Sequence, residues 1–283
     1  MFNRIIAWLL GAANTILLWA GYPAFPAGQK LDLGKFTLTW QDEFDGGSLD
    51  SAKWGGHGFS GGAHKRRDGY WCLEMAQVRD GALHIPSVYL EDGAAGGPAG
   101  YYSLGIDTHG LFSQRYGYFE ARCKLPRGQG LWSAFWMYND MVGSAESSPQ
   151  AGTEVDIYES AYHKDRWPKK NSVSSNLHYY DGGYAGKLHS QNVGRWFVKK
   201  PYDTFRTYGV EWNENEYIFY IDGVETGRSS FGGVCQNELW LLLSVEHQFG
   251  GWAGDIRGNK PEGMTDFVID YVRVYQYKEL IGD

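Results

Sequence analysis

Three carboxylate residues stand close together in the stretch from Gly152 to Ser160, which reads GTEVDIYES. Apolar and acidic residues alternate there as along a half-buried strand, so Glu154 and Asp156 should project to the same face. Glu159 is an odd number of positions beyond Glu154, and simple alternation would turn it to the opposite face. We therefore expect a β-bulge between Asp156 and Glu159, because its extra residue would return Glu159 to the acidic face.

Two glutamates with a shorter aspartate between them could place an acid and a nucleophile on either side of one sugar bond. Glycosidases that retain configuration need two carboxyl groups about 5–5.5 Å apart for this chemistry. Crowding three carboxylates should push at least one pKa upward, which serves catalysis rather than folding. The alternative is a solvent-exposed acidic strand face with no chemical role.

The segment before the acidic stretch is rich in aromatic residues. Trp132 and Trp136 share strand parity within residues 130–137. Sugar faces stack on indole rings, so tryptophans beside paired carboxylates favour carbohydrate chemistry. The alternative for both is the interior of a sandwich, where a strand tryptophan usually lies.

The composition indicates a β-rich protein that does not bind nucleic acid. The 283 residues include 12 Trp, 20 Tyr, 14 Phe and 39 Gly, which favours strands and tight turns over helices. The net charge of −7 would repel a phosphate backbone. It also weakly disfavours a polyanionic substrate, although a local basic patch at His64 to Arg67 could override this effect. Residues 56–61 match a dinucleotide glycine pattern, which we reject because no strand precedes it and no helix follows.

The three cysteines, Cys72, Cys123 and Cys235, show no metal-ligand spacing. Cys72 and Cys123 lie in apolar strand-like runs, where we expect buried thiols. One disulfide bond among the three cysteines is left as an alternative, but the odd number of cysteines argues against a disulfide framework.

The N-terminus predicts a targeting segment. Residues 1–22 combine an early arginine with an apolar run, which indicates an export signal, with an uncleaved membrane anchor and a buried helix as the alternatives. Residues 23–30 then form a linker rich in proline and glycine, and a folded domain covers residues 31–280. We expect an extracellular, secreted protein.

Short strands separated by turn signals predict one antiparallel β-sandwich without a second domain. A hairpin is expected between residues 70–78 and 81–85, with Asp80-Gly81 as its turn. A polar loop is expected over residues 162–170. Further strands are expected at residues 36–40, 101–106, 117–125, 131–138, 172–180, 205–212, 216–221, 239–245 and 266–275.

With these motifs in place, the chain resembles glycoside hydrolase family 16 from about Phe36 to Tyr275. The resemblance rests on the bulged motif Glu154 to Glu159 and on five supporting segments in the same order, at residues 40–45, 115–122, 130–136, 208–212 and 270–275. It implies a β-jelly roll of the concanavalin A-like kind with a concave glycan cleft. It also implies Glu154 as nucleophile, Glu159 as general acid/base and Asp156 as the residue that tunes the nucleophile.

The resemblance further implies the substrate class. We expect a monomeric endo-glycosidase that needs no cofactor and acts on a β-1,3- or mixed β-1,3/1,4-glucan. The alternatives are a galactan hydrolase of the agarase, porphyranase or carrageenase kind, a transglycosylase, and a non-catalytic glycan-binding module. Substrate contacts are expected from Trp132, Trp136, Trp71, His178 and Glu246, and Asp270 could join a structural calcium site.

Overall fold

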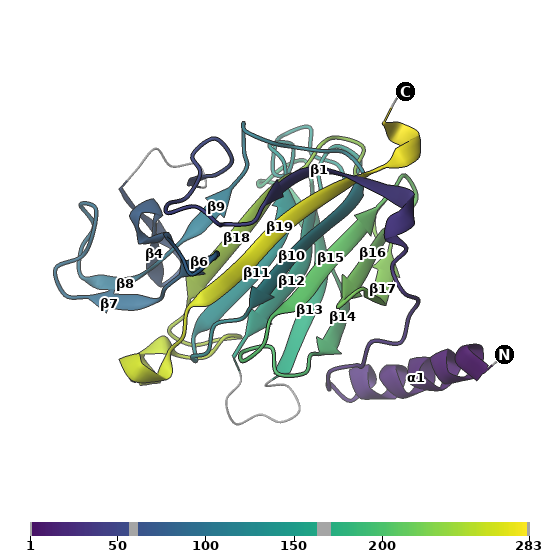
Figure 1. The fold of residues 1–283 in the computed structure, drawn as a ribbon, viewed down its shortest axis with the longest axis horizontal. Helices are drawn as coiled ribbons and strands as arrows, with labels where there is room; N and C mark the ends of the chain where they lie inside the picture. Colours follow the sequence, from purple (N-terminus) through teal and green to yellow (C-terminus); the bar gives the residue numbers. More distant parts are fainter. Residues whose placement is uncertain (1, 57–61, 163–170, 282–283) are drawn as a thin grey trace.

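The computed structural model describes residues 2–56, 62–162 and 171–281, and two large antiparallel sheets dominate this part of the chain (Figure 1). The all-β prediction is confirmed. The glycine-rich stretch 57–61 and most of the loop predicted at 162–170 lie outside the described residues.

The sheet that carries the three acids, called the acidic sheet below, has strand order β14-β13-β12-β11-β18-β9-β2. Its strands are β14 (Lys187–Phe197), β13 (Ser172–Asp181), β12 (Glu154–Ala161), β11 (Leu131–Tyr138), β18 (Trp240–His247), β9 (Gly105–Asp107) and β2 (Gly55–Gly56).

The second sheet, called the back sheet below, has strand order β17-β16-β15-β10-β19-β6-β5, and β1 also pairs with β19. Its strands are β17 (Val224–Ser229), β16 (Tyr217–Ile221), β15 (Arg206–Trp212), β10 (Gly117–Lys124), β19 (Phe267–Tyr277), β6 (Ala82–Ile85), β5 (Gln77–Arg79) and β1 (Phe36–Asp42).

A third, four-stranded sheet, called the small sheet below, lies beside β18 (Figure 1). Its strands are β3 (Ala63–Arg66), β4 (Gly69–Cys72), β8 (Gly100–Ser103) and β7 (Val88–Leu90). The predicted hairpin is therefore only half right. Gln77–Arg79 pairs with Ala82–Ile85 around Asp80-Gly81, whereas Gly69–Cys72 joins the small sheet instead.

Helical structure is sparse in the described residues. One α-helix, α1 (Phe2–Trp19), precedes the sandwich, and the remaining helical pieces are single 3₁₀ turns: η1 (Leu33–Lys35), η2 (Leu73–Met75), η4 (Ile256–Gly258), η5 (Pro261–Gly263) and η6 (Lys278–Leu280).

The core fills the space between the acidic sheet and the back sheet. Alternate residues of each strand point inward, so Phe119 of β10 and Val274 of β19 meet Phe135 of β11 and Leu243 of β18 in one buried cluster. Burying a side chain of this size contributes roughly 1.5–3 kcal/mol. The other face of the acidic sheet is left free to carry chemistry. Cys72, Cys123 and Cys235 are all buried free thiols.

Helix α1 projects away from the sandwich (Figure 1) and exposes Trp8 and Trp19. The Asn14 side chain holds it to the backbone of Phe25 through two hydrogen bonds of 2.6 and 2.9 Å. In the segment predicted as a linker, Ala24 is buried and hydrogen bonds with the backbone of β14. Among the described residues, no helix has both the length and the apolar character needed to cross a membrane.

Packing between the small sheet and the acidic sheet depends on Gly105. A Cβ atom at this position would lie 2.7 Å from the ring of Trp71, which is only 2% exposed and donates its indole N–H to the Val245 carbonyl at 2.8 Å. Glycine therefore lets Trp71 of β4 sit flat against β9.

We predict that Gly105→Ala lowers the free energy of unfolding by about 1–3 kcal/mol, because the buried indole must shift to accept the methyl group. Denaturant unfolding would measure the change. Gly47→Ala is the matched control, since a Cβ there meets nothing within 4 Å. Equal stability of the two variants would contradict the packing argument.

Candidate active site

The acidic stretch forms the interior strand β12, held between β11 and β13. Asp156 pairs with Asn176 of β13 and Glu159 pairs with Ser174. Between these two pairs, two residues of β12 lie opposite one residue of β13. The predicted bulge between Asp156 and Glu159 is confirmed. It turns Glu159 to the same face as Glu154 and Asp156, and all three side chains line one cavity of about 400 Å³.

The half-buried Glu154 and the buried Asp156 form a pair in this cavity, together with His178 from β13. Donor atoms of the three residues lie within 4.8 Å of one another, and Nε2 of His178 is 3.1 Å from Oδ2 of Asp156. Burial, followed by the charge of Glu154, raises the pKa of Asp156 well above its ordinary value. Burial also raises the pKa of Glu154, which His178 opposes.

The charges around Glu154 and Asp156 determine which of the two carboxyl groups is protonated. Two carboxylates this close cannot both ionise without a large penalty, so one of them stays neutral. Asp156 is the deeper of the two at 4% exposure, whereas Glu154 also faces Arg66 and Arg67, which favour its anion. Asp156 therefore holds the proton and Glu154 is ionised. A cation bound by Glu154, Asp156 and His178 would have to displace the proton from Asp156. It would also take the Glu154 carboxylate as one of its ligands.

Glu159 has a different environment from the other two acids. Burial raises the pKa of Glu159 to about 8, while hydrogen bonds from Trp132 and Asn176 oppose the rise. Glu159 is thus a protonated acid at neutral pH. An ionised carboxylate and a protonated carboxyl group on one face are the two groups that a retaining glycosidase requires.

The aromatic residues of the cavity do not all have the predicted role. Trp136 lies across the bulge from Asp156 and donates its indole N–H to Ser244 at 3.2 Å. Trp132 lines the cavity, but the Arg67 guanidinium lies 4.0 Å from its ring centroid and covers part of the surface expected for sugar. Trp71 is a correction: it is buried beneath Arg66 and the acidic sheet, and it offers no face for stacking.

Arg66 and Arg67 are cavity residues that the sequence interpretation noted only as a basic run. Arg66 ends β3 and Arg67 begins the two-residue turn that follows, whose second residue, Asp68, hydrogen bonds with the backbone of His247 and Phe249. Both guanidinium groups contact Glu246, one on each carboxylate oxygen. Glu246 is 5% exposed, so the buried charge expected to bind substrate is already compensated by two arginines.

Two tyrosines extend the cavity beyond the acids, and a third holds one of them in place. Tyr180 and Tyr184 line it, their rings lie 4.9 Å apart, and the hydroxyl groups of Tyr184 and Tyr138 are hydrogen bonded. Tyr184 is 65% exposed, which leaves its ring available to a ligand. Sequence reasoning missed Tyr180 and Asn176, although both share strand parity with His178, and this parity is the signal that could have identified them.

The calcium hypothesis for Asp270 does not fit the structure. Arg122 of the neighbouring strand β10 forms an ion pair with the Asp270 carboxylate. In the described part of the chain, Asp270 belongs to no group of three His, Cys, Asp or Glu side chains close enough to share an ion. The carboxylate is used to pair two adjacent strands of the back sheet.

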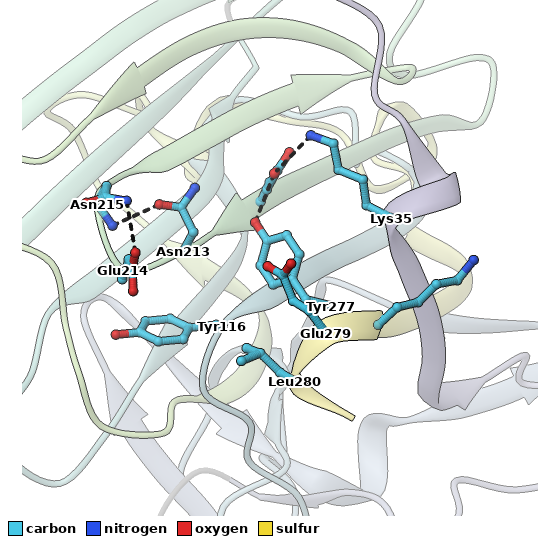
Figure 2. A pocket seen from close by; sticks show the side chains of 10 residues that line it. Lys35, Tyr116, Asn213, Glu214, Asn215, Tyr277, Glu279 and Leu280 are labelled. Atoms are coloured by element: carbon cyan, nitrogen blue, oxygen red, sulfur yellow. Dashed lines mark hydrogen bonds and ion pairs between the residues drawn. The ribbon is translucent and has the colours of Figure 1, made fainter. Parts of the chain in front are cut away.

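A larger cavity, of about 680 Å³, lies at the end of the back sheet beside Tyr116, Tyr277 and Lys35 (Figure 2). Its buried acid, Glu211, accepts hydrogen bonds of 2.9 Å from the hydroxyl groups of Tyr277 and Tyr220. This carboxylate is fully paired and has no second buried carboxylate in the cavity wall. The cavity on the acidic sheet is therefore the candidate active site, despite its smaller volume.

A jelly roll that presents a neutral and an ionised carboxyl group in an aromatic cavity defines the class of β-sandwich glycosidases. The family profile described as "Beta-porphyranase A-D, GH16 domain" matches residues 38–277. The chain belongs to glycoside hydrolase family 16.

Relatives and solved structures agree with this assignment. The protein named "Beta-glucanase" from Rhodothermus marinus is 30% identical over 259 residues, which cover 86% of each chain. "Endo-1,3-1,4-beta-glycanase ExsH" from Rhizobium meliloti (strain 1021) is 29% identical over 70% of this chain, which spans only 39% of that relative's length. The solved structure of SCLam, described as a non-specific endo-beta-1,3(4)-glucanase, superposes with a TM-score of 0.68 at 26% identity, covering 89% of this chain and 94% of that chain.

We predict that kcat/KM falls above about pH 8, because Glu159 must be protonated to assist the leaving group and loses its proton in that range. The fall should approach tenfold per pH unit. A pH profile on a hydrolysed polysaccharide would measure it. An alkaline limb that persists in Glu159→Gln, or one that begins below pH 6, would contradict the assignment of the raised pKa to Glu159.

Proposed function

We propose that the protein is a retaining endo-glycosidase that hydrolyses internal β-1,3- or mixed β-1,3/1,4-linkages of a glucan by double displacement. The observation that carries the proposal is the bulged strand β12, which presents Glu154, Asp156 and Glu159 to one cavity between Trp132 and Trp136.

The first step uses the ionised and the protonated glutamate together. Glu154 attacks the anomeric carbon and forms an ester bond to it, while Glu159 transfers its proton to the departing glycosidic oxygen. In the second step Glu159, now ionised, removes a proton from water. The resulting hydroxide displaces Glu154 from the anomeric carbon, so both carboxyl groups return to their starting states.

Asp156 acts on the nucleophile rather than on the sugar. Its raised pKa keeps it protonated beside Glu154, so it can donate a hydrogen bond to the carboxylate. That hydrogen bond would stabilise the carboxylate when it is released in the second step. It would also hold Glu154 in the orientation needed for attack.

Two kinds of observation support a glucan as the substrate. The Rhodothermus relative and the SCLam structure both carry names that specify glucan cleavage. The cavity wall beyond the acids is formed by tyrosine and tryptophan rings, which suit the uncharged faces of a glucan. Glu246 partly neutralises the charge of Arg66 and Arg67, so an anionic substrate is less necessary to balance that charge.

A sulfated β-galactan is the second candidate, and a specific observation favours it. Arg66 and Arg67 keep 35% and 41% of their side chains exposed while facing a cavity whose family profile is that of porphyranases. Two guanidinium groups share one carboxylate, so a net positive charge remains on this side of the cavity. A sulfate ester could accept hydrogen bonds from either guanidinium.

We also propose that the protein is exported and acts outside the cell as a monomer. The support is the apolar helix α1, which lies outside the sandwich, and an active-site cavity built from one chain. N-terminal sequencing and light scattering of the protein recovered from culture medium would test both points. A chain retained in the cytoplasm, or a stable dimer, would contradict them.

Digestion of a polysaccharide panel tests the proposed substrate. We expect new reducing ends from laminarin or barley glucan, with the first products in the β-configuration by NMR, and none from agarose, porphyran or carrageenan. Glu154→Ala should abolish this release and keep a cooperative unfolding transition. Release from a galactan alone would overturn the glucan assignment, and products longer than the substrate would indicate a transglycosylase.

A further inference from the structure

Two asparagines on adjacent strands form a chain of hydrogen bonds that ends on Glu159. Asn176 of β13 donates from Nδ2 to Oε2 of Glu159, and Asn192 of β14 donates from its Nδ2 to Oδ1 of Asn176 at 2.6 Å. Asn176 and Asn192 are paired in the β13–β14 ladder, directly after an irregularity at Ser175. Asn176 is buried at 8% exposure, so its orientation is set by the protein and not by water.

The amide of Asn176 is held in one of its two orientations. Its oxygen accepts from Asn192, and its nitrogen donates to Glu159 and lies 3.4 Å from the Ser174 hydroxyl. Rotating the amide by 180° would bring two N–H groups together on the Asn192 side and would present the Asn176 oxygen to Glu159. Such a rotation breaks the hydrogen bond from Asn192 and the one that the Asn176 N–H makes with Glu159, so the observed orientation is favoured.

This orientation distinguishes the two oxygens of Glu159. The carbonyl oxygen of a protonated carboxyl group is a better hydrogen-bond acceptor than its hydroxyl oxygen, so the Asn176 N–H favours Oε2 as the oxygen without the acidic proton. The proton is left to Oε1. After the first chemical step the same oxygen, free of Asn176, is the one available to accept a proton from water.

We propose that the Asn192–Asn176 pair is a positioning device that fixes which oxygen of Glu159 carries the catalytic proton. The proposal rests on the proposed function, in which Glu159 is the general acid and base. Neither asparagine lines the cavity, so both act through Glu159 and not on the sugar. No bond is made or broken by the pair; it selects the oxygen through which Glu159 donates and receives one proton.

The charged neighbours of Glu159 do not make this selection. Those that influence it or are influenced by it are Asp156 and Glu154 on its own strand, His178 on β13, and Arg67 at the turn of the small sheet. Each of them shifts how readily the carboxyl group ionises. Trp132 and Asn176 both donate a hydrogen bond to Glu159, and the amide donor at Oε2 is the one whose orientation depends on Asn192.

The central test is Asn192→Asp, which replaces the hydrogen-bond donor at residue 192 with an acceptor. A carboxylate at residue 192 can only accept, so the Asn176 amide should rotate and present its oxygen to Glu159. Glu159 would then hold its proton on Oε2, pointing toward Asn176. We expect kcat on the hydrolysed polysaccharide to fall roughly 10–100-fold with little change in KM, and the alkaline limb of the pH profile to move upward.

Two control variants separate this effect from added charge and from lost packing. Asn192→Ser keeps a hydroxyl donor and should lose less than tenfold in kcat. Asn215→Asp makes the same chemical change on an exposed turn of the back sheet and should leave the pH profile unchanged. Wild-type kcat and pH profile in Asn192→Asp, or an equal loss in Asn192→Ser, would overturn the proposal.

Glu159→Gln, measured in parallel, separates the two levels of the argument. Full activity of Glu159→Gln would refute the proposed function itself. An inactive Glu159→Gln beside an unimpaired Asn192→Asp would refute only the role of the asparagine pair.

Discussion

Burying three carboxylates on one face of a strand carries an electrostatic penalty that shapes the rest of the structure. An isolated β12 with this sequence would turn its acids to water. The flanking strands β11 and β13 and the hydrophobic core beneath them hold Glu154, Asp156 and Glu159 in place. The penalty appears as raised pKa values in all three, because burial disfavours every ionised form. The reaction uses those raised values, which keep two of the acids protonated at neutral pH.

Compensation for the remaining negative charge comes from segments that are distant in sequence. Arg66 at the end of β3 and Arg67 in the turn that follows both face the cavity from the small sheet. The small sheet is therefore part of the site, although it contributes little to the sandwich core. Trp71 and Gly105 attach this sheet to the acidic sheet.

Sequence patterns predicted the elements whose signal is local. Alternation and the odd spacing of Glu159 were enough to predict both β12 and its bulge, and the apolar runs predicted β11 and β18. The edge strand β14 was not predicted, because its polar residues resemble a loop and its partner β13 is what orders it. Trp71 was misassigned because the sequence does not show that Arg66 and the adjoining sheet cover it. Asp270 was misassigned because its partner, Arg122, lies on another strand.

The most direct measurement is to trap the covalent intermediate on the protein. A 2-deoxy-2-fluoro glycoside of the matching sugar, with a good leaving group, should form the glycosyl ester and release it slowly, because fluorine destabilises the oxocarbenium-like transition state. Peptide mass spectrometry should then find the sugar on Glu154. A label on Asp156 or Glu159, or turnover with inversion and no covalent adduct, would contradict the division of roles among the three acids.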